Sequence, residues 1–372
     1  MITRTGRGTV LRRLRKVVPL DGWLPDGRSA RPDDVYLVPT LRCNLACPYC
    51  FQRNADGVAW FPAHPDDLSL DAWRAVVDEL RPMGPSVYVI GGELFLYRGA
   101  MDLLRSVKAA GLPLSIITNG TALPAVADEL VAMGLDGLVV SIDGPPEVHN
   151  TLRGHPRGYE LATEGIHKVL AGRADRRHPS VQVFTAITPA TQGHLPAFAR
   201  AMGELGVDRV VLNHLIYATP EQAAAQAEVL EAVFGVERPT ANALANGFED
   251  AIDVAALRRS MAEIRAGPWS DRVVVSPAGV EANVEGYYAP GAPAFRGQCC
   301  RAVNREMWIM PNGDVSACVH IGELVMGNVR DGGLRAAWNS PAYRRFRRHL
   351  GEEGLLPACA RCEKLTYHHP PR

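Results

Sequence analysis

The sequence predicts an α/β protein: an open, partial (β/α)6 TIM-like barrel followed by a small α+β domain that carries cysteines. Two observations predict this fold. Six short apolar runs alternate with helical segments between residues 35 and 216, which is typical of βαβ units and a parallel sheet. Five of the eight cysteines then gather between Cys299 and Cys362, near the end of the chain.

The barrel elements follow from apolar patterns. The expected strands are rich in Val, Leu and Ile, as strands buried on both faces are. Six units are too few for a complete eight-stranded barrel, so the sheet is expected to stay open. The strands are Val35–Pro39, Val87–Ile90, Leu114–Ile117, Leu138–Ile142, Val181–Ala186 and Val210–Leu212, with helices that include Leu70–Leu80, Ala100–Ala110 and Ala125–Met133.

The expected organisation has four parts: a basic N-terminal arm (1–34), the barrel (35–217), a helical linker region (218–294) and the small cysteine-bearing domain (295–372). The linker region is rich in alanine, a strong helix former. Its best helices are expected at Gln222–Phe234 and Val254–Arg265, with a further strand at 272–276. The arm carries six Arg and Lys residues before Asp21, the first acid. A solvated basic arm is expected.

Composition excludes several function classes. Lys+Arg and Asp+Glu balance at 40 each, so no overall field favours nucleic acid as a partner. No apolar stretch is long enough to span a membrane, and the N-terminus lacks the apolar region of a secretory signal. The cysteines are clustered, which favours metal sites over a disulfide framework. A cytoplasmic protein is therefore expected.

Three cysteines follow the first expected strand at the spacing C-x3-C-x2-C: Cys43, Cys47 and Cys50. Three thiolates can hold one face of an iron–sulfur cube and leave its fourth iron without a protein ligand. An open metal position is where a small molecule can chelate. The alternative is a structural zinc or redox loop, which would need a fourth ligand nearby. The nearest histidine, His64, is not placed convincingly for that role.

This motif, with an aromatic residue before its last cysteine, resembles that of the radical S-adenosylmethionine (SAM) superfamily. The resemblance implies a [4Fe–4S] cluster that binds SAM. Gly91, Gly92 and Glu93 follow the second strand, as a similar segment of the family does, and are implied to meet the amino group of SAM. The paired glycines suit a close backbone approach. The family usually has proline after this glutamate, where Leu94 stands here.

Two further segments are similar to family segments. Asn119 follows the third strand, and Ser141 and Asp143 follow the fourth, where the family often contacts the ribose or carboxylate of SAM. Arg153 is a candidate partner for that carboxylate. The alternative is a structural salt bridge between Arg153 and Asp143. All these segments fall at the carboxyl ends of strands, where parallel barrels place their active sites.

A second constellation consists of Cys300, Cys318, Cys359 and Cys362. A turn at 311–314 (Pro-Asn-Gly-Asp) predicts a hairpin, which would bring the first two together. The pattern resembles the auxiliary-cluster module called SPASM, or its shorter form, the twitch domain. The resemblance implies one auxiliary [4Fe–4S] cluster with four cysteine ligands. A structural four-cysteine zinc site is the alternative.

Two residues have competing interpretations. Cys299 is either a buried small hydrophobe, the true ligand in place of Cys300, or a thiol that returns a hydrogen atom to a substrate radical, as in radical epimerases. His214 ends the sixth strand. It could orient a substrate or move a proton, and the alternative is a core histidine.

The resemblance also implies a reaction. A 5′-deoxyadenosyl radical would take a hydrogen atom from a substrate at the barrel mouth, and the auxiliary cluster would accept a second electron. A flavodoxin- or ferredoxin-type reductant is implied. The basic segment Arg344–Arg348 is expected to be a solvated helix face, with docking of an acidic electron donor as the alternative.

The substrate class is open at this point. The spacings Cys300-x17-Cys318 and Cys359-x2-Cys362 are similar to those of 2-deoxy-scyllo-inosamine dehydrogenase, which favours a small natural-product intermediate such as an aminocyclitol or sugar. A ribosomal peptide, crosslinked or epimerised, is the alternative. Peptide-modifying relatives usually have a longer region before the barrel than the segment before Val35. A non-catalytic electron carrier is a third possibility, against which the open iron beside Gly91–Glu93 argues.

Overall fold

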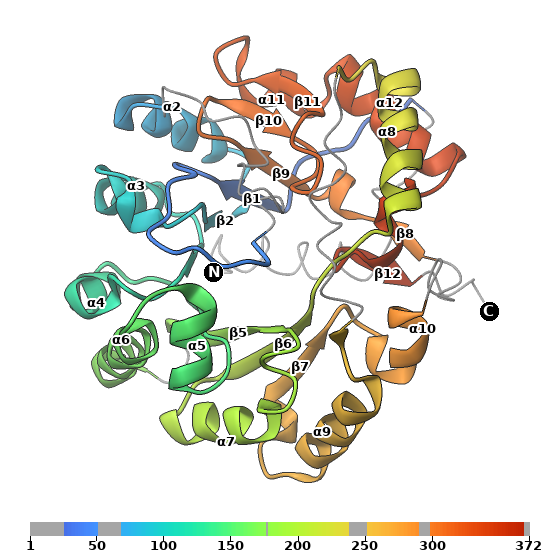
Figure 1. Ribbon diagram of the computed structural model, residues 1–372. Coiled ribbons are helices and arrows are strands. Elements are labelled where there is room, and N and C mark those ends of the chain that lie inside the picture. The colour runs from blue at the N-terminus through green and yellow to red at the C-terminus, as the bar shows by residue number, and fades with distance from the viewer. Residues whose placement is uncertain (1–25, 51–67, 176–177, 238–250, 290–297, 368–372) are drawn as a thin grey trace, which may run out of the picture.

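The computed structural model describes residues 26–50, 68–175, 178–237, 251–289 and 298–367. Ten of its strands form one sheet in the order β11-β10-β9-β1-β2-β3-β4-β5-β6-β7, and β12 and β8 form a second. Figure 1 shows helices on the outer side of the curved main sheet and the C-terminal strands beside β1. The expected α/β class, with a partial barrel and a small C-terminal α+β domain, is confirmed.

The barrel consists of parallel strands that alternate with helices. Each neighbouring pair from β1 to β7 is parallel. Its strands are β1 (Asp34–Leu37), β2 (Ser86–Val89), β3 (Leu114–Thr118), β4 (Gly137–Ser141), β5 (Ser180–Ile187), β6 (Arg209–His214) and β7 (Val273–Ser276). Its helices are α2 (Leu70–Leu80), α3 (Ala100–Ala109), α4 (Leu123–Ala132), α5 (Pro146–Arg153), α6 (Gly158–Gly172), α7 (Leu195–Leu205), α8 (Pro220–Phe234), α9 (Val254–Ala266) and α10 (Val284–Tyr288).

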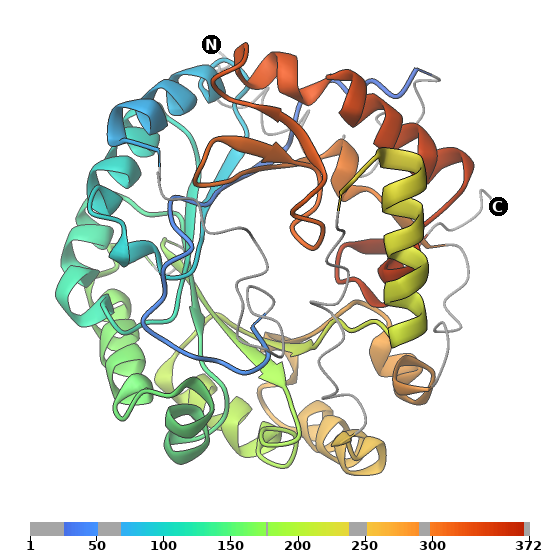
Figure 2. The ribbon, with the colours of Figure 1, turned by 45° about the horizontal axis from the view of Figure 1, so that its top comes forward.

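Strand β1 buries one face more completely than the other. In β1, Val35 and Leu37 are fully buried, whereas Asp34 and Tyr36 are only half-buried. Side chains alternate between the two faces of a strand, so one face packs under the helices and the other lines the barrel. Figure 2 looks into this barrel and shows the blue-to-green helices as a continuous outer layer.

Four strands extend the main sheet beyond the six expected barrel strands: β7 at one edge, and β9, β10 and β11 at the other. The strand predicted at 272–276 is β7, which pairs in parallel with β6. At the other end, β9 (Glu306–Ile309) pairs in parallel with β1. The C-terminal cysteine-bearing segment therefore continues the main sheet through backbone hydrogen bonds.

The C-terminal segment contains the expected hairpin. β9 and β10 (Asp314–Ser316) are antiparallel, and Gly313 between them has a φ of +86°, a conformation that glycine adopts at no steric cost. Met326, Leu334 and Trp338 are buried in the main core. The remaining elements are β8 (Gln298–Cys300), β11 (Val325–Asn328), α11 (Gly333–Trp338), α12 (Pro341–Glu352) and β12 (Leu365–Tyr367).

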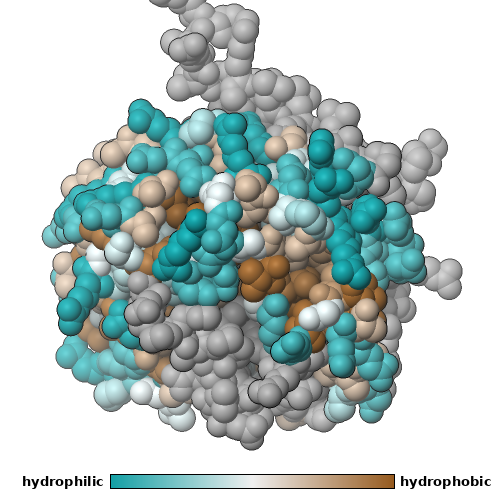
Figure 3. All heavy atoms as spheres, turned by 90° about the horizontal axis from the view of Figure 1, so that it is seen from above, coloured by the Kyte–Doolittle hydropathy of each residue, from teal (hydrophilic) through white to brown (hydrophobic). Residues whose placement is uncertain are grey.

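Several sequence features lie outside the described residues, among them the basic residues between Arg4 and Lys16 and His64. Figure 3, seen from above, shows hydrophilic side chains over much of the coloured surface, interrupted by smaller apolar areas. Within the described ranges, no helix combines the length and apolar character that a membrane crossing requires.

Candidate functional site

The loop that holds Cys43, Cys47 and Cys50 leaves the carboxyl end of β1 and contacts the ends of neighbouring strands. Asn119, directly after β3, donates from Nδ2 to Oδ1 of Asn44 over 2.9 Å. The backbone N–H of Ala46 donates to the carbonyl of Arg153 at the end of α5 (3.3 Å). The structure therefore brings together the four segments that the sequence singled out separately.

Gly91 and Gly92 allow a close approach between two backbone segments of this chain. A Cβ atom on Gly91 would lie 2.4 Å from the carbonyl oxygen of Thr40, and one on Gly92 would lie 2.3 Å from that of Arg42. The N–H of Gly92 donates to Thr40 (3.0 Å), and that of Glu93 donates to Arg42 (2.7 Å). The glycines thus seat the end of β2 against the segment that leads into Cys43.

Glu93 is a buried carboxylate, 2% exposed, whose oxygens accept hydrogen bonds from three groups. Oε1 accepts from the hydroxyl of Thr118 (2.7 Å) and the N–H of Phe95 (3.4 Å), and Oε2 accepts from the N–H of Asn119 (2.8 Å). Burial raises the pKa of Glu93, and these donors oppose that rise. The carboxylate is therefore fixed beside the cysteine loop.

Asp143 is fully buried and is bonded on both carboxylate oxygens. Oδ2 accepts from Nε of Arg153 (2.7 Å) and from the hydroxyl of Tyr49, and Oδ1 accepts from the N–H of Ala186 (2.7 Å). The N–H of Asp143 donates to Nδ1 of His149 (3.0 Å). Of the two alternatives for Arg153, the salt bridge with Asp143 is formed. Ser141, at the end of β4, is half-buried.

The three thiols of the first site are unbridged and partly buried. Burial raises the pKa of Cys47 to about 11, and Cys43 and Cys50 contribute to the rise because their negative charges repel that of Cys47. Arg153 lowers this pKa, because its positive charge favours the thiolate. The position of the three thiols on one loop fits the predicted ligand set. The SAM contacts stay a prediction for Gly91, Gly92, Glu93, Asn119, Ser141, Asp143 and Arg153.

The second site gathers four cysteines from distant parts of the segment. Burial raises the pKa of Cys300 to about 11 and that of Cys359 to about 12. The pKa of Cys318 is also raised, first by burial and then by the charges of Cys359 and Cys300. That of Cys362 is raised first by burial, then by Glu363, and then by the other three thiols. These mutual effects show that the four sulfurs lie near one another.

Cys299 differs from this set. It lies beside Cys300 in β8, opposite Thr366 of β12, whereas Cys300 lies opposite Leu365. Because successive side chains of a strand point to opposite faces, Cys299 and Cys300 cannot both face the other three thiols. Cys300, Cys318 and Cys359 pack against the main core. This arrangement favours Cys300 as the ligand, and the role of Cys299 stays a prediction.

The spacing of the sulfurs tests which metal group fits. A tetrahedral zinc site with Zn–S bonds of about 2.3 Å holds its sulfurs about 3.8 Å apart. Among the described residues, no three cysteine sulfurs lie within 4.8 Å of one another. The donor sets, three thiolates at one site and four at the other, fit [4Fe–4S] clusters, and no cysteine triplet among the described residues is spaced for a single zinc ion.

One mixed set of side chains does come closer together, at the edge of the second site. His320, Cys362 and Glu363 bring one ligand atom each within 4.8 Å of the others. Glu363 Oε2 lies 3.3 Å from Nε2 of His320 and 3.6 Å from Sγ of Cys362. Although burial alone would raise the pKa of Glu363, His320 and Lys364 lower it to about 2. The carboxylate therefore places a negative charge beside one predicted ligand.

His214 lies in the environment of a core histidine. It is fully buried on the same face of β6 as Leu212 and Val210, and its Nδ1 lies 2.8 Å from the hydroxyl of Tyr288. Burial lowers the pKa of His214 to about 4. This matches the structural alternative given above, and the catalytic role stays a prediction.

The basic helix α12 is only partly a solvated face. Arg347 is 6% exposed and donates to the carbonyls of Val303 (2.8 Å) and Gly27 (3.3 Å). Arg344 donates to the carbonyl of Asp26 (3.0 Å). Arg345 and Arg348 are exposed. Two of the four arginines therefore hold the N-terminal segment in place, which weakens the idea of a basic docking surface.

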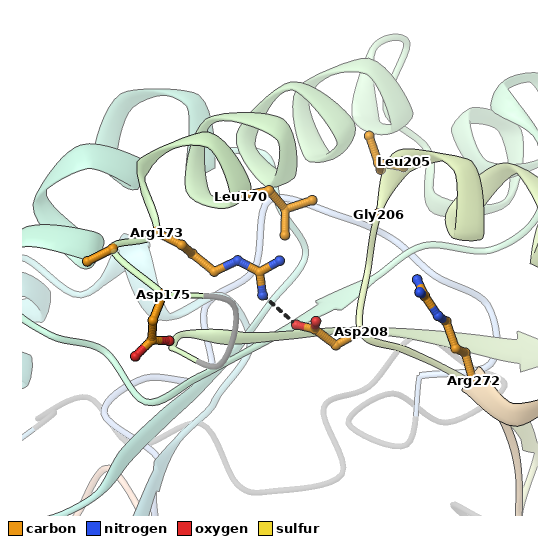
Figure 4. A pocket seen from close by; sticks show the side chains of 8 residues that line it. Leu170, Arg173, Asp175, Leu205, Gly206, Asp208 and Arg272 are labelled. Carbon is orange, nitrogen blue, oxygen red and sulfur yellow. Dashed lines mark hydrogen bonds and ion pairs between the residues drawn. The ribbon is translucent and has the colours of Figure 1, made fainter.

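A cavity of about 540 Å³ lies away from the cysteines. It is lined by Arg173, Asp208 and Arg272 among others, next to the amino ends of β6 and β7, whereas the cysteine loop follows a carboxyl end. Figure 4 shows Arg173 directed toward Asp208, with which it forms an ion pair of 2.7 Å. The cavity lies at the wrong end of the strands for the predicted chemistry.

The sequence reasoning missed three side chains of the first site. Tyr49 and Asn44 link the cysteine loop to Asp143 after β4 and to Asn119 after β3, and Thr118 at the end of β3 bonds Glu93. Tyr49 and Asn44 lie inside the cysteine motif, and Thr118 directly precedes Asn119. Their position within the motifs was the available signal, but their partners depend on which strands are neighbours.

The comparisons with known proteins agree with this geometry. Residues 37–176 match the radical SAM superfamily, and residues 299–363 match the SPASM iron–sulfur cluster-binding domain. The tungsten-containing aldehyde ferredoxin oxidoreductase cofactor-modifying protein of Pyrococcus furiosus is 32% identical over 197 residues, which cover 50% of this chain and 53% of that protein. The match therefore spans about half the length of that relative.

Longer matches are more distant. The PqqA peptide cyclase of Xanthomonas campestris is 26% identical over 344 residues (90% of this chain, 80% of that protein). The AdoMet-dependent heme synthase of Methanosarcina barkeri is 26% identical over 337 residues (87% and 86%).

The fold is similar to that of the crystal structure of Streptococcus suis SuiB bound to the precursor peptide SuiA, with a TM-score of 0.60 and 16% identity, covering 87% of this chain and 68% of that one. Residues 37–176 are therefore a radical SAM domain and residues 299–363 a SPASM domain, and these domains imply SAM, a SAM-binding [4Fe–4S] cluster and a further iron–sulfur group as cofactors.

Proposed function

We propose that this protein is a radical SAM oxidoreductase that removes two electrons from a small polar substrate. The observation that carries the proposal is the second site, where Cys300, Cys318, Cys359 and Cys362 offer a complete set of four unbridged, partly buried thiols. Cluster sites with four protein ligands have no position left for substrate. A redox role therefore suits this site better than substrate binding.

At the first site, Cys43, Cys47 and Cys50 would hold the SAM-binding cluster. When bound there, this cluster supplies the electron that cleaves SAM to methionine and a 5′-deoxyadenosyl radical. The chain's own residues orient the parts. Gly91 and Gly92 fix the loop before Cys43 by close backbone contact, and Asn119 fixes Asn44 within it.

Glu93 is suited to hold the amino group of SAM. Its carboxylate accepts three hydrogen bonds within the protein, and a carboxylate has acceptor capacity for about four. The remaining capacity matches an ammonium donor, and its partial desolvation would strengthen that contact. Ser141, at the end of β4, would contact the ribose.

Two kinds of observation bear on the substrate class, and they favour different candidates. The cysteine spacing of the second site favours a small natural-product intermediate, such as an aminocyclitol or sugar, oxidised at a C–H bond. A ribosomal peptide is the second candidate, because the PqqA peptide cyclase matches most of this chain and SuiB bound to a precursor peptide shares its fold. A radical epimerase that uses Cys299 would differ from both in being redox-neutral.

The test is substrate-dependent turnover. The reconstituted, reduced protein is incubated with SAM and with aminocyclitols and sugars in one series and short peptides in another, and 5′-deoxyadenosine is measured above the substrate-free background. The proposal expects stimulation by the small polar series and a product that has lost two hydrogens. Stimulation by peptides alone, or a product isomeric with its substrate, would reject it.

A further inference from the structure

Arg153 and Asp143 form a buried charge pair beside the cysteine loop. The SAM-binding role predicted for these two residues does not explain why they pair with each other. The Asp143 side chain is fully buried, and that of Arg153 is 9% exposed. In such a site charges are weakly screened, because little water separates them from their neighbours. Their effect on an adjacent redox group is correspondingly large.

Each member of the pair is tied to the loop as well as to the other member. Arg153 accepts at its carbonyl from the N–H of Ala46 (3.3 Å), the residue before Cys47. Its guanidinium carbon lies 6.0 Å from the ring centre of Tyr49, two residues after Cys47. Asp143 accepts from the hydroxyl of Tyr49 and from Arg153. The loop between Ala46 and Tyr49 is therefore held against a fixed cation and a fixed anion.

The two members of the pair carry opposite charges, so they act in opposite directions on any charge held by the cysteine loop. Burial lowers the pKa of Arg153, but Asp143, Tyr49 and Cys47 outweigh burial and raise it. Arg153 therefore stays charged across the whole working pH range, which makes it a constant source of field.

We propose that Arg153 and Asp143 are positioning residues that set the reduction potential of the cluster held by Cys43, Cys47 and Cys50, with Arg153 raising the potential and Asp143 lowering it. The inference rests on the proposed ligand role of these cysteines. Adding one electron to a cluster adds one negative charge, so a nearby cation stabilises the reduced form and a nearby anion destabilises it.

Asp143 accepts hydrogen bonds on both oxygens, from Arg153 and Tyr49 on one and from Ala186 on the other. These bonds hold the anion in a fixed position beside the loop. Tyr49 has a different role: its uncharged hydroxyl bonds Asp143 and so keeps the cysteine loop at a fixed distance from Arg153 and Asp143.

The experiment measures the potential of the holoenzyme directly. An anaerobic redox titration follows the EPR signal of the cluster, identified as the signal that changes when SAM is added. Arg153→Met is expected to lower the ratio of reduced to oxidised cluster at a fixed potential, and Asp143→Asn is expected to raise it. A tenfold change in this ratio corresponds to about 59 mV for one electron. The double variant should lie between the two single variants.

A neutral control separates charge from packing. Tyr49→Phe removes the hydroxyl bond to Asp143 without changing any charge, so its potential should stay closest to wild type. Shifts in the same direction for Arg153→Met and Asp143→Asn, or no shift in either, would overturn the inference, because loss of packing alone has no reason to give opposite signs.

If Arg153→Met fails to hold the cluster, Arg153→Lys and Arg153→Gln decide the matter. The lysine variant should keep the wild-type potential and the glutamine variant should lower it, and equal potentials in the two would overturn the inference. Failure of the underlying assignment is distinguishable: a wild-type protein with no SAM-responsive signal would reject the ligand role of the three cysteines itself.

Discussion

Substitution of Gly92 by alanine should disable the first cluster site while sparing the second. The new Cβ would lie 2.3 Å from the carbonyl oxygen of Arg42 and 2.4 Å from that of Leu41. A carbon and a carbonyl oxygen normally pack at about 3.3 Å or more, so the backbone before Cys43 must move by about 1 Å. Both contacts are with backbone, which cannot turn aside as a flexible side chain can.

The expected cost combines two terms. Overpacking of this kind costs about 1–3 kcal/mol, and the hydrogen bonds from Gly92 to Thr40 and from Glu93 to Arg42 contribute about 1 kcal/mol each. A local penalty of about 3–5 kcal/mol follows if the bonds are lost. It falls on the loop that carries Cys43, and not on the C-terminal segment.

Iron content and SAM cleavage measure the result. Two [4Fe–4S] clusters contain about eight irons per chain, and loss of one leaves about four. Gly92→Ala should retain about four irons and form little 5′-deoxyadenosine. Gly193→Ala is the matched control, because its Cβ would meet nothing within 4 Å and its φ is not left-handed. A Gly92→Ala protein with the iron content and turnover of the control would refute the reasoning.

Three further predictions concern the second site and the core. Cys300→Ser should remove the auxiliary cluster and Cys299→Ser should keep it, as measured by iron content; the reverse result would show that the two cysteines were assigned in the wrong order. Because the pKa of His214 is lowered to about 4, the unfolded chain binds more protons between pH 6.5 and 4, so the free energy of unfolding falls as pH falls through this window. The His214→Gln variant should lose about 1 kcal/mol less of its free energy of unfolding than the wild type between pH 8 and pH 6. Chemical unfolding of the anaerobic holoprotein measures this difference, and an unchanged pH dependence would contradict the assignment. Arg361→Met removes hydrogen bonds to the carbonyls of Tyr287 (2.8 Å) and Ala289 (3.0 Å). It should lower the free energy of unfolding by about 3 kcal/mol and loosen the auxiliary cluster, whereas Arg348→Met, at an exposed position, should do neither. Equal stability of the two variants would argue against Arg361 as a buried anchor.

Local patterns in the sequence were sufficient to predict the six barrel strands and the helices α2, α3 and α4. The helix expected at Leu70–Leu80 has those bounds in the structure, and the strands differ by only a few residues at their ends. Apolar periodicity reports burial against a neighbour, so it identifies each element well. It does not report which neighbour. The pairing of β7 with β6 and of β9 with β1 depends on the whole sheet, and only the structure shows it.

The candidate site was predictable to a similar degree. Motif spacing identified the candidate ligand cysteines and the strand ends expected to line the site. Parallel topology then brings those strand ends together. The partners within the site were less accessible. Whether Arg153 faces Asp143 or a ligand depends on side-chain directions at the end of α5, and the role of Gly92 depends on a backbone contact with Arg42 that spacing does not encode.

The most direct test of the account is SAM cleavage by the wild-type protein and by a variant in which Cys43, Cys47 and Cys50 are all replaced by alanine. Both are reconstituted with iron and sulfide, reduced without added substrate, and analysed for iron and for 5′-deoxyadenosine. The account predicts that the wild type cleaves SAM, and that the triple variant keeps about four irons but forms no 5′-deoxyadenosine. Cleavage by the triple variant, or none by an iron-replete wild type, would contradict it.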